Sequence, residues 1–130
     1  MLDADVIIRG ERGVFDLFGW LNGQPGEQFE LAAITVAELW HGVERAGGKH
    51  RAVREAYLQT VISLLPVIPY TEQTGYIHAR IWADLEKKGR MISEYDIVIG
   101  ATALERGSAV ATFNQKHYQS IRGLGVIVPA

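Results

Sequence analysis

The sequence contains no cysteine, only four prolines and no strong excess of charge of either sign. Without cysteine it has no disulfide framework, no thiolate zinc site and no cysteine nucleophile. Its net charge of −2 gives no global basic field, so a nucleic acid would have to be bound at a local site. The 48% hydrophobic and 22% charged residues are ordinary for a globular protein, which excludes the disordered, collagen-like and coiled-coil classes.

Long hydrophobic runs are also missing. The longest stretch without a formally charged side chain covers residues 56–71 and contains Pro66 and Pro69. It is shorter than the roughly 20 apolar residues that a membrane helix needs. No basic segment followed by an apolar block opens the chain, where the acid Asp3 stands instead. We therefore expect a cytoplasmic protein without membrane contact, whose residues 1–130 form a single domain.

Short strand-like segments alternate with longer helical segments along the chain. Runs rich in apolar and β-branched residues predict strands, and apolar residues spaced three or four apart predict helices. This alternation predicts an α/β sandwich with a mainly parallel sheet. The expected strands cover residues 1–8, 29–34, 66–69, 108–113 and 125–128, and the expected helices cover residues 14–21, 35–47, 53–65, 71–88 and 93–107.

Polar side chains stand where such a sheet binds its ligands, at the carboxyl ends of the strands. Asp3 lies in or just after the first expected strand, and Asn114 follows the strand that ends at Phe113. Glu38 and Asp96 each lie one turn into a helix. Clustered carboxylates repel one another unless a cation lies among them. Oxygen ligands of this kind suit Mg²⁺ or Mn²⁺.

A purely structural explanation competes with this one for two of the acids. Thr35-x-x-Glu38 is a capping box and Ser93-x-x-Asp96 is a close variant, so either acid could simply satisfy backbone donors at a helix start. Asp3 is different, because an acid in an otherwise apolar N-terminal strand has no cap to explain it. Its position favours a functional role.

Four blocks of the sequence resemble those of PIN-domain proteins, in the same order and over nearly the whole chain. The subgroup that they resemble most is the VapC-type toxins of bacterial toxin–antitoxin pairs. The blocks are residues 2–8 (LDADVII), 34–43 (ITVAELWHGV) and 92–103 (ISEYDIVIGATA), and residues 111–114 (ATFN) followed by Tyr118 and residues 123–126 (GLGV).

The resemblance implies a PIN-like three-layer sandwich with a central, mainly parallel sheet. It also implies a metal-dependent endoribonuclease, the toxin of a type II pair, which hydrolyses RNA phosphodiester bonds with carboxylate-held Mg²⁺ or Mn²⁺. The metal ligands carry over to Asp3, Asp96 and Glu38. The fourth catalytic position falls on Asn114, which has no charge, so the number of bound metal ions, one or two, stays open. Thr112 would orient a water molecule, and the partners would be RNA, a cognate antitoxin and a second copy of the chain.

Two other functions stay open at this point. One is a PIN fold that only binds, which the uncharged Asn114 favours. The other is a receiver-like signalling domain, but residues 67–70 offer no phosphoacceptor aspartate and Lys116 is a poor match for its lysine. A basic stretch over residues 45–54 could contact phosphates or could be an ordinary solvated helix face. His117 is expected at the surface rather than in catalysis.

Overall fold

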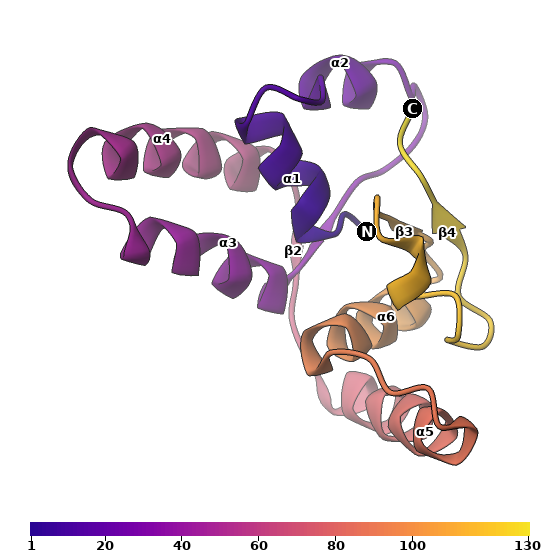
Figure 1. The fold of residues 1–130 in the computed structure, drawn as a ribbon. Coiled ribbons are helices and arrows are strands. Elements are labelled where there is room, and N and C mark those ends of the chain that lie inside the picture. Colours follow the sequence, from indigo (N-terminus) through magenta and orange to yellow (C-terminus); the bar gives the residue numbers. More distant parts are fainter.

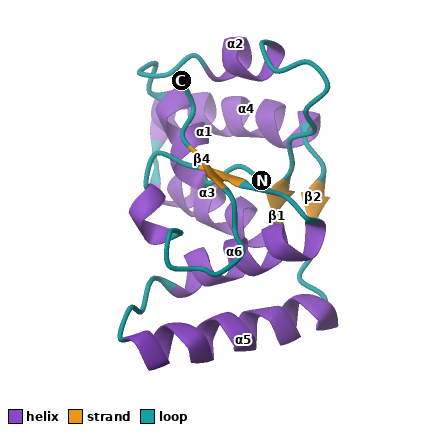
Figure 2. Cartoon of the chain, turned by 90° about the vertical axis from the view of Figure 1, so that its right-hand side faces the viewer, coloured by secondary structure: helices purple, strands orange, loops and turns teal.

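The sheet of the computed structural model, which describes residues 1–130, consists of short parallel strands. β1 (Leu31–Ala32) pairs with β2 (Val67–Ile68), and β3 (Val110–Ala111) pairs with β4 (Val126–Ile127). Figure 2 shows β1 and β2 together on one side of the molecule, apart from β4. The predicted parallel pairing is confirmed, although each strand is shorter than the apolar run that predicted it.

The N-terminal segment joins the two strand pairs into one central layer. Leu2 forms a parallel bridge with Ala111. The backbone N–H of Asp3 donates to the carbonyl of Ala111, and that of Leu2 donates to the carbonyl of Glu30, both at 2.9 Å. The order across the layer is therefore β4, β3, the N-terminal residues, β1 and β2.

Helices cover both faces of this layer (Figure 1). The hairpin of α3 and α4 extends away from the sheet, whereas α5 and α6 pack together on the other side. None of the helices has the length and apolar character needed to cross a membrane. The helices are α1 (Ala4–Glu11), α2 (Leu17–Asn22), α3 (Ala33–Arg45), α4 (Gly48–Leu64), α5 (Glu72–Lys88) and α6 (Glu94–Arg106), with a short 3₁₀ turn, η1 (Gln115–His117).

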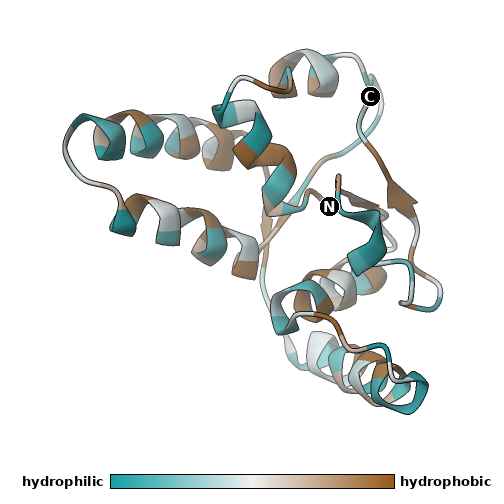
Figure 3. Ribbon diagram, in the orientation of Figure 1, coloured by the Kyte–Doolittle hydropathy of each residue, from teal (hydrophilic) through white to brown (hydrophobic).

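Two hydrophobic cores lie on opposite faces of the layer, because successive side chains of a strand point to opposite sides. One core lies against α5 and α6, and the other lies among α1, α2, α3 and α4. Figure 3 shows the strands as hydrophobic and the helices as a mixture of hydrophobic and hydrophilic turns. This arrangement is the three-layer sandwich that the resemblance implies. Met1, Ala32 and Val110 belong to the first core, and their neighbours Leu2, Leu31 and Ala111 belong to the second.

The prediction of a strand over residues 1–8 is wrong beyond its first residues. Helix α1 begins at Ala4, and Asp3 is its N-cap, with Oδ1 accepting the N–H of Ala4 at 2.9 Å. A short apolar run does not distinguish a strand from a buried helix, and an Asp before such a run is also a helix-start signal. Val6 and Ile7 are fully buried on one side of α1. Asp3 therefore has the capping role that the strand assignment denied it.

Candidate active site

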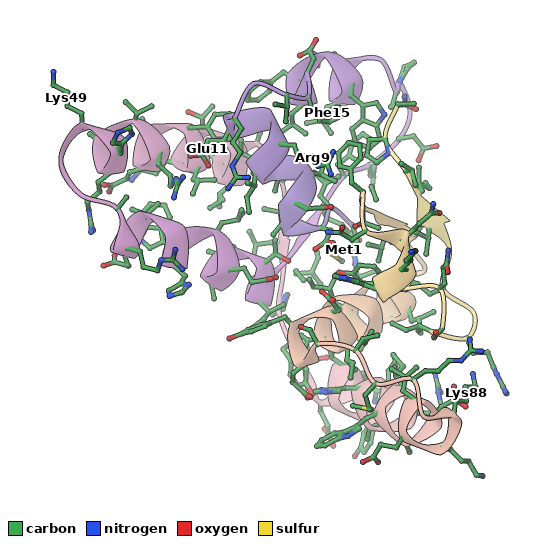
Figure 4. The ribbon with its side chains drawn as sticks, in the orientation of Figure 1. Met1, Arg9, Glu11, Phe15, Lys49 and Lys88 are labelled. Atoms are coloured by element: carbon green, nitrogen blue, oxygen red, sulfur yellow. The ribbon has the colours of Figure 1, made fainter.

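Four acids from three segments of the chain meet at one edge of the sheet. Asp3 and Asp5 belong to the start of α1, Glu38 to α3 and Asp96 to the first turn of α6. The other three acids all lie close enough to Glu38 to raise its pKa by charge repulsion. In Figure 4 side chains from the start of α1, the start of α3 and the start of α6 gather in the region beside Met1. The carboxyl ends of neighbouring parallel segments thus bring together acids that are far apart in sequence.

Asp3 is held rigidly. It is 5% exposed, and both of its oxygens accept hydrogen bonds. Oδ1 accepts the N–H of Ala4, and Oδ2 accepts the hydroxyl of Thr112 at 2.8 Å. Thr112 is fully buried, and its Oγ1 in turn accepts the N–H of Asn114 at 2.9 Å. Thr112 therefore fixes the orientation of the Asp3 carboxylate.

Asp5 lies beside Asp3, and the Thr112 hydroxyl is within 3.5 Å of carboxylate oxygens of both acids. Its Oδ2 accepts the backbone N–H of Phe113 and the side-chain Nδ2–H of Asn114, both at 3.0 Å. Burial, and after it the charge of Asp3, raise the pKa of Asp5. The exposed Asn114 side chain thus bonds to an acid of the cluster, where the resemblance placed a fourth catalytic residue.

Glu38 is the least satisfied acid of the group. Its Oε1 is buried and has no hydrogen-bond partner. Burial, followed by the charges of Asp3, Asp96 and Asp5, raises its pKa to about 7. The capping-box explanation is wrong here, because α3 begins earlier than expected, at Ala33, and has no side-chain cap.

Asp96 is also buried and also plays no capping part. The hydroxyl of Tyr118 donates to its Oδ1 at 3.2 Å, and Nδ1 of His117 lies 3.0 Å from its Oδ2. Ser93, the N-cap of α6, makes no side-chain cap bond. Burial and the charge of Asp3 raise the pKa of Asp96, and His117 opposes this shift. The capping alternative therefore fails for this acid as well.

The sequence did not predict that His117 and Tyr118 contact Asp96. His117 is half-exposed, but its ring reaches the Asp96 carboxylate. Tyr118 is fully buried, and burial together with the charges of Asp3 and Asp96 raises its pKa, so its hydroxyl stays a neutral donor. The turn η1 returns both side chains to α6 after β3. No periodicity marks so short a turn, and only the Tyr118 of the fourth sequence block pointed to it.

These residues suit a divalent cation in donor type and in charge. Every acid offers hard oxygen ligands. Glu38 leaves a buried oxygen unpartnered, and the charges of three neighbouring acids raise its pKa. No group of three acidic or histidine side chains is arranged to hold an ion as it stands. Asp3 and Asp96 bond to protein donors, so ion binding would replace some of these hydrogen bonds.

The raised pKa of Glu38 gives the metal-free protein a pH-dependent stability. Between the ordinary value of 4.5 and the folded value of about 7, the folded state binds more protons than the unfolded state. The free energy of unfolding therefore falls as pH rises through this window. Because the side chain is only partly buried, we expect Glu38 to contribute a loss of about 2 kcal/mol between pH 5 and pH 8.

The Glu38→Gln variant cannot ionise at this position, so its free energy of unfolding should fall less between pH 5 and pH 8. Urea unfolding of both proteins in EDTA at these two pH values measures the difference. Asp5 and Asp96 also have raised pKa values, but they are present in both proteins and contribute to both curves. If the free energy of unfolding changed with pH equally in wild type and variant, the pKa of Glu38 would not be raised in the folded protein.

Known proteins resemble this chain in both sequence and structure. The PIN domain family profile matches residues 1–122. Ribonuclease VapC1 of Rickettsia felis is 31% identical over 128 residues, which cover 98% of this chain and 93% of that protein. The DNA-bound VapBC structure from Salmonella typhimurium matches with a TM-score of 0.87 at 26% identity, over 97% of this chain and 94% of that chain. VapBC-5 of Mycobacterium tuberculosis, described as a member of the VapBC family of toxin–antitoxin systems, matches with a TM-score of 0.68 at 27% identity, over 75% and 79%.

The likeness covers all four sequence blocks and the whole arrangement of layers. It rules out the receiver-like alternative, in which the sheet would carry a different set of acids. Nucleases of this family generally depend on a divalent metal ion. This chain belongs to the PIN domain family and, within it, to the VapC-type ribonucleases.

Proposed function

We propose that this protein is the toxin of a type II toxin–antitoxin pair and that it cleaves RNA with Mg²⁺ or Mn²⁺ held by Asp3, Glu38 and Asp96. One observation supports the site above all others. Three separate segments bring these acids so close together that burial and mutual repulsion raise the pKa of Glu38 to about 7. A protein that used these acids only to start helices would gain nothing from placing them together.

The chemistry of phosphodiester hydrolysis assigns a part to each side chain. A bound divalent cation supplies positive charge beside the phosphate and makes water a better nucleophile. Asp3, fixed on both oxygens, and Asp96, from the facing helix, are the direct ligands in this proposal. The unpartnered Oε1 of Glu38 is free to accept a hydrogen bond from the attacking water.

Thr112 and Asn114 take supporting parts in this proposal. The Thr112 hydroxyl already donates to Asp3 and accepts from the backbone of Asn114, so it holds the Asp3 ligand rather than a water molecule. Asn114 brings no charge, and its amide bonds to Asp5. We assign the fourth charge of the site to Asp5. Binding measurements would decide whether the site holds one metal ion or two.

A ribonuclease that attacks the RNA of its own cell must be silenced by a partner. The likeness to VapBC-5, from a toxin–antitoxin family, supports a protein antitoxin as that partner. We place this activity in the cytoplasm, where RNA and antitoxin meet, and expect a homodimer. Expression of this chain alone should therefore stop growth, and co-expression of the neighbouring small reading frame should restore it.

The purified protein provides the direct test. It should cleave single-stranded RNA with Mg²⁺ or Mn²⁺, stop when EDTA is added, and recover when Mn²⁺ is restored in excess. A folded protein that binds RNA or an antitoxin and cleaves nothing with either metal would instead establish the binding-module alternative. Harmless expression of a chain that does cleave RNA in vitro would argue against the toxin role alone.

A further inference from the structure

A hollow of about 460 Å³ opens beside Glu38, next to the acid cluster. Ala37, Glu38 and His41 of α3 line it, together with Tyr95 of α6. Tyr95 directly precedes Asp96 in the chain and is 52% exposed, so its ring contributes little to either core. An exposed aromatic ring thus forms a wall of the space that leads to the acids.

A second hollow continues from the first along the same helix. It has a volume of about 200 Å³ and shares Glu38 and His41 with the first. Residues 38, 41 and 45 are three or four apart and therefore lie on one face of α3. Together the two hollows extend from Tyr95, past Glu38, to side chains of α1, α3 and α4 that line the second hollow.

Cationic side chains line the far end of this path. Arg54 is bound to Glu11 at 2.6 Å and to the carbonyl of Gly42. Arg12 and Arg45, by contrast, are exposed and make no ion pair. Seven residues of helix advance about 10 Å, so Arg45 lies within a few nucleotides of Glu38 along the helix. The path therefore has an aromatic ring near the acids and free guanidinium groups farther away.

We propose that single-stranded RNA lies along this face of α3, with one base against the Tyr95 ring and with phosphates at Arg45 and Arg12. This inference rests on the proposed ribonuclease function. Aromatic rings stack on the π-face of any base, and unpaired guanidinium groups bind phosphate oxygens. An RNA strand that passes the acids along this path would meet the aromatic ring first and the guanidinium groups a few nucleotides farther on.

A basic hollow on the other side of the molecule is the competing surface for RNA. Lys88, Arg90 and Arg122 line it, and it shares no residue with the acid cluster. Lys88 lies in the last turn of α5, where a cation balances the helix dipole, and it already pairs with Asp84 at 2.7 Å. The position of Lys88 is therefore explained without RNA, and Arg90 provides a matched control for Arg45.

The Tyr95 contact is tested with Tyr95→Ala and Tyr95→Phe. The Ala variant should show a KM for single-stranded RNA raised about tenfold with little change in kcat, because stacking holds the substrate, whereas the Phe variant should resemble wild type. Binding of a labelled oligoribonucleotide in EDTA at low salt should weaken similarly without any turnover. Tyr76→Ala is the control, since Tyr76 is 63% exposed on α5 and lines neither hollow.

The cationic end is tested with Arg45→Gln against Arg90→Gln, which remove the same charge. The Arg45 variant should weaken binding of every oligoribonucleotide and reduce the salt slope of log K by about 0.7, the value for one single-strand phosphate contact. The Arg90 variant should match wild type. A weaker Arg90 variant beside an unchanged Arg45 variant would put RNA on the other face and overturn the proposal.

The outcomes separate this path from the ribonuclease function. A wild-type protein that cleaves RNA, with unchanged KM and binding in both Tyr95→Ala and Arg45→Gln, would overturn the path and leave the function standing. Wild type that neither binds nor cleaves RNA would overturn both. If these variants lost only the complex with a protein antitoxin, the hollows would hold a peptide and the RNA path would be wrong.

Discussion

Replacing Asp96 with Asn is expected to lower metal-dependent RNA cleavage by about a thousandfold or more, with the fold intact. The loss of one ligand charge removes several kcal/mol of stabilisation of the transition state, which corresponds to a rate change of that order. The variant should fold normally, because Asn keeps an oxygen that can accept the Tyr118 hydroxyl now bonded to Oδ1. Initial rates with Mn²⁺, read beside the thermal unfolding temperature, measure both effects.

Glu94 provides the matched control for this substitution. It lies in the same first turn of α6 but is exposed and pairs with His78 at 2.7 Å, away from the acid cluster. Glu94→Gln removes the same charge and should leave cleavage unchanged. Full activity in the Asp96→Asn protein, or equal losses in the two variants, would sink the assignment of Asp96 as a metal ligand.

Mn²⁺ is expected to raise the unfolding temperature of the wild-type protein substantially. In the metal-free state the acids repel one another, and a bound cation relieves this repulsion. A ligand present at about 100 times its dissociation constant stabilises the folded state by about 2.7 kcal/mol. For a chain of this length that corresponds to an increase of the order of 10 °C.

Asp3→Asn should change this response in two ways at once. It should remove most of the Mn²⁺-induced increase in unfolding temperature, because Asp3 is a direct metal ligand in this proposal and its carboxylate is held in place by hydrogen bonds. It should also leave the metal-free protein as stable as wild type or more so, because Asn can still cap α1 and the loss of one repelling charge offsets the lost acceptor for the Thr112 hydroxyl. The measurement is thermal unfolding of both proteins with EDTA and with excess Mn²⁺. Equal increases in the two would place the metal elsewhere.

Local signals in the sequence predicted the helices of the α5–α6 face well. The helix expected over residues 71–88 is α5, with Thr71 as its N-cap in a capping box and Gly89 ending it at a φ of 66°. A side chain that satisfies helix-start donors and a glycine in the left-handed region act within a few residues. Such boundaries need no information from the rest of the fold.

The acids themselves were predicted for a reason that proved partly mistaken. Asp3 was set apart because a strand offers it no cap, yet it caps α1. For Glu38 and Asp96 a capping role stayed open as the alternative to metal binding, and neither has it, since one leaves a buried oxygen unpartnered and the other bonds to Tyr118. Capping depends on where a helix begins, and a shift of two residues, as at α3, changes which side chain can reach the free N–H groups.

Contacts between distant segments lay beyond the sequence pattern. The pairing of Asp96 with His117 depends on the turn η1 after β3, which has no apolar period to announce it. The bond from Thr112 to Asp3 joins residues 109 positions apart. Only the parallel order of the central segments brings these groups together. The family resemblance conveyed part of this information because its blocks come from folded relatives.

Counting bound Mn²⁺ tests the central claim most directly, because it needs neither substrate nor partner. Electron paramagnetic resonance measures free Mn²⁺ in a titration of wild type and of Asp3→Asn at equal protein concentration, with Glu94→Gln as the control. The proposed site predicts saturable binding of at least one ion per chain in wild type and in the control, and its loss in Asp3→Asn. Equal binding by all three proteins would contradict a metal centre built on Asp3, Glu38 and Asp96.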